Sequence, residues 1–209
     1  MNIEYQNKLY DVEIIRKNNK NIYIRVKNNK VIITCNYLTS NKTIKKLINE
    51  NYNSIIKMID KMESKTERQT KFYLFGKYYN IIFKEDVKIE IEEDTIYAKD
   101  EKTLNKWLSN YIKNTFSNHL KYWYDLYEEA IPAPNLKIRK MTTRWGVCNT
   151  KNHNITLNSE LFRYDIDCLD YVIIHELSHF IEPNHSRAFW DQVEKYCRNY
   201  KEIRKKLKD

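Results

Sequence analysis

The feature that most constrains this chain is an apolar segment, residues 171–181, that carries two histidines and a glutamate. It reads Tyr-Val-Ile-Ile-His-Glu-Leu-Ser-His-Phe-Ile, so a helix formed here is apolar on nearly every face and must be buried. His175 and His179 are four residues apart and therefore lie on one face of such a helix. Buried imidazoles need polar partners, and a metal ion would supply them. The segment therefore predicts a core helix with a metal site.

The spacing H-E-x-x-H is typical of zinc hydrolases, in which two imidazoles bind one zinc ion and the glutamate is a general base. Here the glutamate is Glu176. His185 is the predicted third ligand, because Pro183 ends the helix and the turn that follows can bring the chain back. Three protein ligands leave a fourth position for water, which indicates a catalytic site. Glu194 is the alternative third ligand, although zinc favours the neutral imidazole.

The distance from the first to the third histidine also matches the metzincin pattern, H-E-x-x-H-x-x-G-x-x-H. Glu182 replaces its glycine, however, and no methionine follows His185, so that group is excluded. His119 lies in a separate long helical pattern and is predicted to be structural or exposed.

Further motifs surround the histidines, namely Arg144-Trp145-Gly146-Val147-Cys148, Ile155–Asn158, Asp170–His179 and Asn184–Trp190. With Ile22–Val26 and Leu74–Tyr79, they resemble the YgjP-like metallopeptidase family over essentially the whole chain. That family is related at motif level to the SprT-like proteases. The resemblance implies a zincin-like fold, one zinc ion bound by His175, His179 and His185, and a catalytic Glu176. Val147 departs from the pattern, since the family usually has serine there.

We therefore expect a zinc metallopeptidase that acts on a peptide or protein substrate, with Glu176 as general base. Arg144 is the predicted substrate-binding residue, where it would stabilise the oxyanion; alternatively it pairs with a carboxylate and holds its loop. Residues 155–158 could form the edge strand against which a peptide pairs. Two other functions stay open: zinc-dependent hydrolysis of nucleotide phosphoanhydrides, and a nucleic-acid-associated protease or binding module.

Charge, cysteine content and hydropathy indicate possible partners and a cellular location for the protein. Residues 1–64 hold twelve Lys and Arg against six Asp and Glu, within a net charge of +9. This surplus could bind nucleic-acid phosphates weakly, and the alternative, which is the more ordinary one, is a surface of solvated lysines. The four cysteines are widely spaced, as in reduced thiols; Cys148 lies in the motif near the expected cleft. No signal peptide or membrane-spanning run is present, so we expect a cytoplasmic protein without a membrane partner.

The expected fold class is α+β and zincin-like, with a β-rich N-terminal subdomain and a mixed sheet packed on the metal helix and a long helix. Residues 1–64 are predicted to form β-hairpins plus a helix that ends near Met62, and residues 71–209 the metallopeptidase region; one continuous domain 1–209 is the alternative. The polar run 64–70 is the candidate boundary. Lys-Asn-Asn-Lys at 17–20 and 27–30 predicts hairpin turns, and Thr39 or Ser40 a helix cap. Later strands are expected at 72–75, 78–83, 87–98, 137–141 and 155–158, and helices at 101–129 and from 186 onward.

Overall fold

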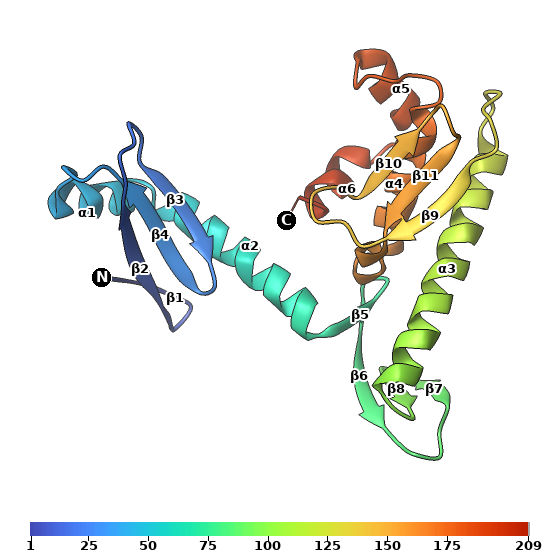
Figure 1. Ribbon diagram of the computed structural model, residues 1–209, viewed down its shortest axis with the longest axis horizontal. Coiled ribbons are helices and arrows are strands. Elements are labelled where there is room, and N and C mark those ends of the chain that lie inside the picture. The colour runs from blue at the N-terminus through green and yellow to red at the C-terminus, as the bar shows by residue number, and fades with distance from the viewer. Residues whose placement is uncertain (209) are drawn as a thin grey trace. The chain divides into compact units, whose positions relative to one another are not determined.

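The computed structural model describes residues 1–208, with side chains described for all of them except 65 and 67–70. The chain forms two compact units, Met1–Thr70 and Lys71–Asp209, each with its own sheet structure and hydrophobic core (Figure 1). Within the described residues, helices accompany three mixed sheets, which confirms the predicted α+β class.

The first unit is a four-stranded sheet covered by two helices. The sheet order is β1-β2-β4-β3, with β2 and β4 parallel and the two outer pairs antiparallel. Alternate residues of β4 are fully buried, and they pack with Ile44, Ile55 and Ile59 of the helices. The elements are β1 Asn2–Tyr5, β2 Lys8–Arg16, β3 Tyr23–Lys27, β4 Lys30–Cys35, α1 Asn41–Glu50 and α2 Tyr52–Thr70.

Two tight turns join antiparallel strands in this unit. Asn28 and Asn29 have positive φ angles of 51° and 58° between β3 and β4, which confirms the hairpin predicted at 27–30. Gln6 and Asn7 form an equivalent turn between β1 and β2 that the sequence pattern did not indicate. The hairpin predicted at 17–20 is wrong, because β2 pairs in parallel with β4 and not with the strand that follows it.

The helix predicted to end near Met62 is in fact two helices. Ser40 caps α1, since its side chain accepts a hydrogen bond from the Thr43 amide at 3.1 Å, as predicted. At the end of α1 the Asn51 side chain donates to the Leu47 carbonyl oxygen at 2.9 Å, and α2 begins immediately afterwards. The backbone of α2 stays helical through the polar run 64–70, so this run is not an irregular linker.

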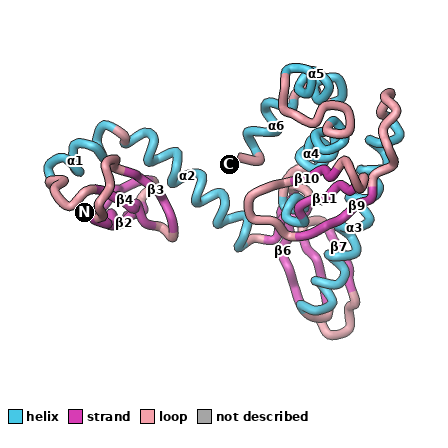
Figure 2. Tube along the Cα trace, turned by 45° about the horizontal axis from the view of Figure 1, so that its top comes forward, coloured by secondary structure: helices cyan, strands magenta, loops and turns pink. Residues whose placement is uncertain are grey.

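The second unit opens with a sheet of order β5-β6-β8-β7, made of β5 Phe72–Leu74, β6 Lys77–Phe83, β7 Ile89–Glu92 and β8 Thr95–Ala98. Gly76 turns the chain between β5 and β6 at φ +82°, and a Cβ atom there would meet the Asp165 backbone at 3.1 Å. Helix α3 then runs over Glu101–Leu126 beside β7 and β8 (Figure 2). It ends before the predicted residue 129, because Tyr127 is extended.

A second sheet, of order β10-β11-β9, lies against the helix that carries the histidines. Helix α4 packs on β10 and β11, and α3 packs on α4 and β9, as predicted (Figure 1). The prediction of an edge strand at 155–158 is wrong, because β11 lies between β9 and β10 and is paired on both sides. The two edge strands of this sheet are β9 and β10. The elements are β9 Asn135–Arg139, β10 Gly146–Asn149, β11 Asn154–Asn158, a 3₁₀ turn η1 Ser159–Arg163, α4 Ile166–Ser178, α5 Arg187–Tyr196 and α6 Tyr200–Lys206.

Within residues 1–208, none of the helices combines the length and apolar character that crossing a membrane requires. All four cysteines carry free thiols. Three of them are buried, and Cys148 is half-buried.

Candidate metal centre

Helix α4 is buried over most of its surface, as the apolar residues around His175 predicted. Ile173 and Leu177 are fully buried, so the helix is locked into the core of the second unit. Glu176 and Ser178 are the buried polar residues of this helix. Because each of them needs a polar partner, their surroundings decide what the helix can do.

A hydrogen-bond network holds the last turn of α4. The hydroxyl of Tyr127, just beyond α3, donates to the Ile174 carbonyl oxygen at 3.0 Å and lies 2.9 Å from Ser178 Oγ. Ser178 Oγ also donates to the Ile174 carbonyl oxygen, at 2.8 Å. All three groups are buried, so the network fixes the part of the helix from which the histidines project.

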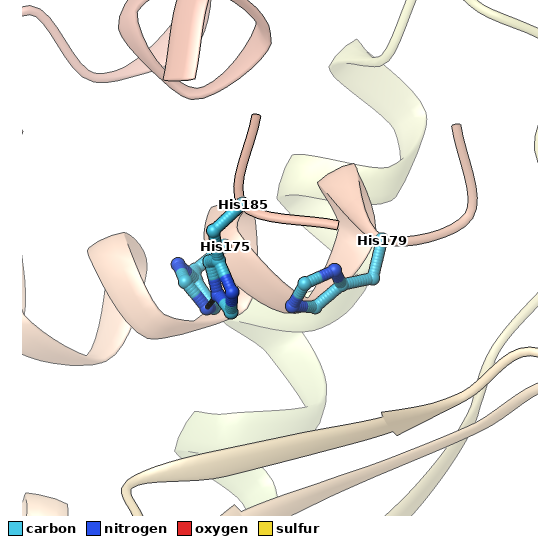
Figure 3. Close-up of side chains that lie close together, drawn as sticks. All are labelled: His175, His179 and His185. Atoms are coloured by element: carbon cyan, nitrogen blue, oxygen red, sulfur yellow. Dashed lines mark hydrogen bonds between the residues drawn. The ribbon is translucent and has the colours of Figure 1, made fainter. Parts of the chain in front are cut away.

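The structure brings His175, His179 and His185 together. Helix α4 ends at Ser178, and the chain turns through Pro183 so that His185 returns to the helix. One ligand atom from each histidine lies within 4.8 Å of the others, and the Nε2 atoms of His175 and His185 are 3.1 Å apart. In Figure 3 the three rings converge on one region beside the end of the helix.

The protonation of these rings suits a metal. His179 Nδ1 lies 3.2 Å from the Glu182 carbonyl oxygen, which can only accept, so Nδ1 carries the proton and Nε2 is free to bind. Burial, followed by the charges of His179 and His185, lowers the pKa of His175 to about 3. Burial also lowers the pKa of His179. Both imidazoles are therefore neutral at neutral pH, the form that binds metals.

The donor set and the spacing of two of the histidines fit zinc. Two nitrogens bound to one tetrahedral zinc ion lie about 3.3 Å apart, and the 3.1 Å between His175 and His185 is close to that value. His175 Nδ1 is buried and has no hydrogen-bond partner among the described residues. Glu194 is exposed on α5 and does not join the group of three histidines.

Two aromatic residues of α5 support the histidines. The ring centre of Phe189 lies 4.9 Å from that of His175, 4.6 Å from that of His179 and 4.8 Å from that of His185. Trp190 stacks on His185 at 5.7 Å. Phe189 is fully buried, so it forms a fixed apolar surface behind all three rings.

The carboxyl group of Glu176 is buried against the backbone of Gly146, the first residue of β10. Only 4% of Glu176 is exposed, and a Cβ atom at position 146 would lie 2.8 Å from its Cγ and Cδ atoms. Burial raises the pKa of Glu176 to about 8, and a backbone hydrogen bond from Cys148 and the charge of Arg144 partly oppose this rise. The group is therefore more basic than an ordinary glutamate.

A cleft of about 700 Å³ opens in front of Glu176 and the histidines. Arg144 lines it, and within residues 1–208 its exposed guanidinium makes no hydrogen bond or ion pair, so the predicted alternative of a loop-holding pair with a carboxylate is not seen. Burial raises the pKa of the Cys148 thiol to about 12, helped by the charge of Glu176, which makes it a small apolar group and not a reactive thiolate. The other lining residues are Thr143, Trp145, Gly146, Val147, Tyr171, Val172, Arg204, Leu207 and Lys208.

The remaining histidine of interest, His119, is structural as expected: its Nδ1 lies 2.6 Å from Asp170 Oδ1 and links α3 to α4. Sequence reasoning missed the Tyr127 and Ser178 network and the contact between Gly146 and Glu176. No local signal predicts the network. The scarcity of glycine, with only two in the chain, marks position 146 as unusual.

A family model described as "YgjP-like, metallopeptidase domain" matches residues 20–209 of the chain. The chain is also similar to the metallopeptidase zymogen abylysin of Pyrococcus abyssi, with 23% identity, coverage of 48% of this chain and 90% of that chain, and a TM-score of 0.34. For the metallopeptidase zymogen jannalysin of Methanocaldococcus jannaschii the identity is 27%, the coverage 46% and 92%, and the TM-score 0.36. At these TM-scores neither structure guides the interpretation of the site. No curated protein matches the chain.

Proposed function

This chain belongs to the YgjP-like metallopeptidase family, and we propose that it hydrolyses peptide bonds with one zinc ion held by His175, His179 and His185. The observation that carries the proposal is the convergence of three imidazoles beside a buried carboxylate. When bound, zinc would polarise the scissile carbonyl and make a water molecule more acidic.

Glu176 is the proposed general base. Its carboxylate takes a proton from the attacking water and returns that proton to the leaving amine. Burial favours this role, because it raises the pKa of the group to about 8, close to the pH at which the group must both accept and return a proton. The contact with Gly146 keeps the carboxylate in one place. Arg144 reaches Glu176 electrostatically and is the proposed donor to the oxyanion.

The edge of β10 is the proposed binding site for the substrate backbone. The Asn158 amide donates to the Trp145 carbonyl oxygen at 2.9 Å, and hydrogen-bonded pairs alternate along an antiparallel ladder. The backbone groups of Gly146 and Cys148 therefore point away from β11. Because the Cys148 amide donates to Glu176, the groups left for a peptide are those of Gly146 and the Cys148 carbonyl oxygen. No strand among the described residues pairs with that side of β10, so an extended peptide added there would pass beside Glu176.

Replacing Glu176 by glutamine tests the mechanism. Glutamine is nearly isosteric and does not ligate the metal, so Glu176→Gln keeps the fold and the zinc but cannot accept a proton. We expect casein cleavage by matched zinc-loaded preparations to fall by about a hundred- to ten-thousandfold. Full activity of the variant would remove Glu176 from the mechanism.

The ligand set is tested by metal analysis of the purified protein. We expect about one zinc per chain for the wild type, little for His179→Ala and His185→Ala, and wild-type content for the control Glu194→Ala. Loss of zinc from Glu194→Ala together with its retention by His185→Ala would make Glu194 the third ligand.

A second candidate function is hydrolysis of nucleotide phosphoanhydrides. It is favoured by one observation, the presence of three cations, Arg144, Arg204 and Lys208, around the cleft. The same Glu176→Gln pair assayed for pyrophosphate release from nucleoside triphosphates separates the two functions. The second function is favoured if the wild type hydrolyses triphosphates but does not cleave casein, and if Glu176→Gln loses the triphosphate hydrolysis.

A further inference from the structure

The cleft beside the histidines carries an excess of positive charge. Arg144, Arg204 and Lys208 are the cations among its lining residues, and the buried Glu176 is the one carboxylate described there. Arg204 comes from α6, far in sequence from the other motifs. It lines the same cleft as the three histidines.

Arg204 lies over the face of Trp190, within cation–π distance. Its guanidinium carbon lies 4.8 Å from the centre of the Trp190 ring. Trp190 in turn stacks on Tyr200, at 5.2 Å with an angle of 11°, and on His185. The same indole ring therefore contacts Arg204 and a proposed zinc ligand. A cation–π contact supplies no hydrogen-bond acceptor to a guanidinium, so its N–H groups remain available to a ligand.

The helix that carries Arg204 is itself anchored to the second unit. Trp145 Nε1 donates to the Leu207 carbonyl oxygen at 2.9 Å, and Lys206 Nζ donates to Asp165 at 2.7 Å. Leu207 is buried in the main core. Because α6 is tied down immediately after Arg204, the backbone from which this side chain projects is fixed before any ligand arrives.

Within residues 1–208, the guanidinium of Arg204 has no carboxylate in ion-pair distance, and the side chain is exposed. A guanidinium in cation–π contact with an indole ring, without a carboxylate partner of its own, matches the two oxygens of a carboxylate. We propose that Arg204 binds a carboxylate of the substrate beside the scissile bond, so that the enzyme prefers peptides with a negative charge there. The carboxylate is an Asp or Glu side chain or the free C-terminus of the peptide. This inference rests on the proposed peptidase activity.

Charge reversal at Arg204 tests the inference on a mixed peptide library. The library is digested with zinc-loaded wild type, Arg204→Glu and Lys205→Glu, and the new termini are identified by mass spectrometry. Lys205 is the matched control, because it is an exposed cation on the same helix that does not line the cleft. We expect acidic residues to be enriched next to the sites cut by the wild type and by Lys205→Glu. Arg204→Glu should lose this enrichment and favour Lys or Arg.

Matched synthetic peptides then measure the effect and identify the source of the carboxylate. The peptides place Glu or Gln beside one mapped site, each with a free or an amidated C-terminus. We expect kcat/KM to differ by about ten- to hundredfold between the preferred and the neutral peptide, and the difference to vanish in Arg204→Gln. A preference that follows Glu identifies a side chain, and one that follows the free terminus identifies the C-terminal carboxylate.

Other outcomes separate this inference from the proposed function. The inference is overturned if the wild type cleaves peptides without regard to charge. It is also overturned if Arg204→Gln slows the cleavage of all peptides equally, because Arg204 then has only a structural role in its contact with Trp190. If the wild type cleaves none, the peptidase proposal fails, and fluorescence anisotropy with an acidic and a neutral labelled peptide decides the inference. Tighter binding of the acidic peptide that is lost in Arg204→Gln would support it, whereas equal binding would overturn it.

Discussion

The contact between Gly146 and Glu176 predicts the effect of adding one methyl group at the start of β10. In Gly146→Ala the new Cβ atom would lie 2.8 Å from the Cγ and Cδ atoms of Glu176, whereas ordinary contacts begin at 3.4 Å. Gly146 does not have a positive φ, so alanine brings no backbone strain of its own. Because α4 is buried and held by the core, the carboxylate side chain is the part that must move.

The size of the effect follows from that displacement. Oε1 of Glu176 would lie closer still to the new Cβ atom, so the carboxylate must retreat by about 1 Å, and a misplacement of about that size in a catalytic group costs about a hundredfold in rate. We therefore expect kcat to fall by about a hundredfold. Overpacking should also lower the free energy of unfolding by about 1–3 kcal/mol. The three histidines are untouched, so the zinc content should stay at the wild-type value.

The assay compares Gly146→Ala with wild type for zinc content, thermal unfolding and cleavage of casein. Thr150→Ala is the matched control, since Thr150 is exposed in the turn that follows the same strand and does not line the cleft. Unchanged kcat in Gly146→Ala would refute the view that this contact positions the base. Loss of zinc from this variant would show instead that the methyl group disturbs the metal site.

Three further predictions follow from other contacts. Phe189→Ala should lower the free energy of unfolding by about 3–5 kcal/mol and weaken zinc binding, because it removes the apolar surface behind all three histidines. Chemical denaturation and zinc titration measure the two effects, and Phe189→Leu should lose less stability and less zinc affinity than Phe189→Ala. Burial raises the pKa of Glu129, but hydrogen bonds from Lys195 and Tyr196 outweigh it and lower the pKa to about 2. The stability that ionised Glu129 contributes is therefore complete above its ordinary pKa of 4.5 and is lost as the pH falls from there toward 2. In urea denaturation, the difference in the free energy of unfolding between wild type and Glu129→Gln should therefore become smaller over this range. A difference that does not change with pH would contradict the assignment. The basic surplus of residues 1–64 predicts weak nucleic-acid binding that falls steeply with salt. Replacing the exposed Lys45 and Lys46 by glutamate should reduce this binding. If the wild type does not bind short DNA or RNA at low salt, the prediction is wrong and these lysines are solvated surface charges.

The convergence of the histidines could be anticipated from the sequence because it depends on local geometry. Positions 175 and 179 share a helix face by the period of the helix alone, and Pro183 forces the turn that returns His185. The Asn28-Asn29 hairpin and the Ser40 cap are equally local, since each depends on a few adjacent residues. For such features the sequence is sufficient.

The surroundings of the histidines were decided by contacts between distant segments. Which strand takes the edge of the sheet depends on pairing between residues 135–139, 146–149 and 154–158, and period-two alternation is the same for a central and an edge strand. The identical Lys-Asn-Asn-Lys runs form a hairpin only where the flanking strands happen to pair with each other. Arg204 meets Trp190, and Gly146 meets Glu176, only after α6 and β10 have packed on the core. The local spacing of residues therefore determined which groups could do chemistry. What surrounds those groups was determined only by the long-range packing of the chain, because the free energy of a contact between two distant segments depends on both segments and cannot be inferred from either one alone.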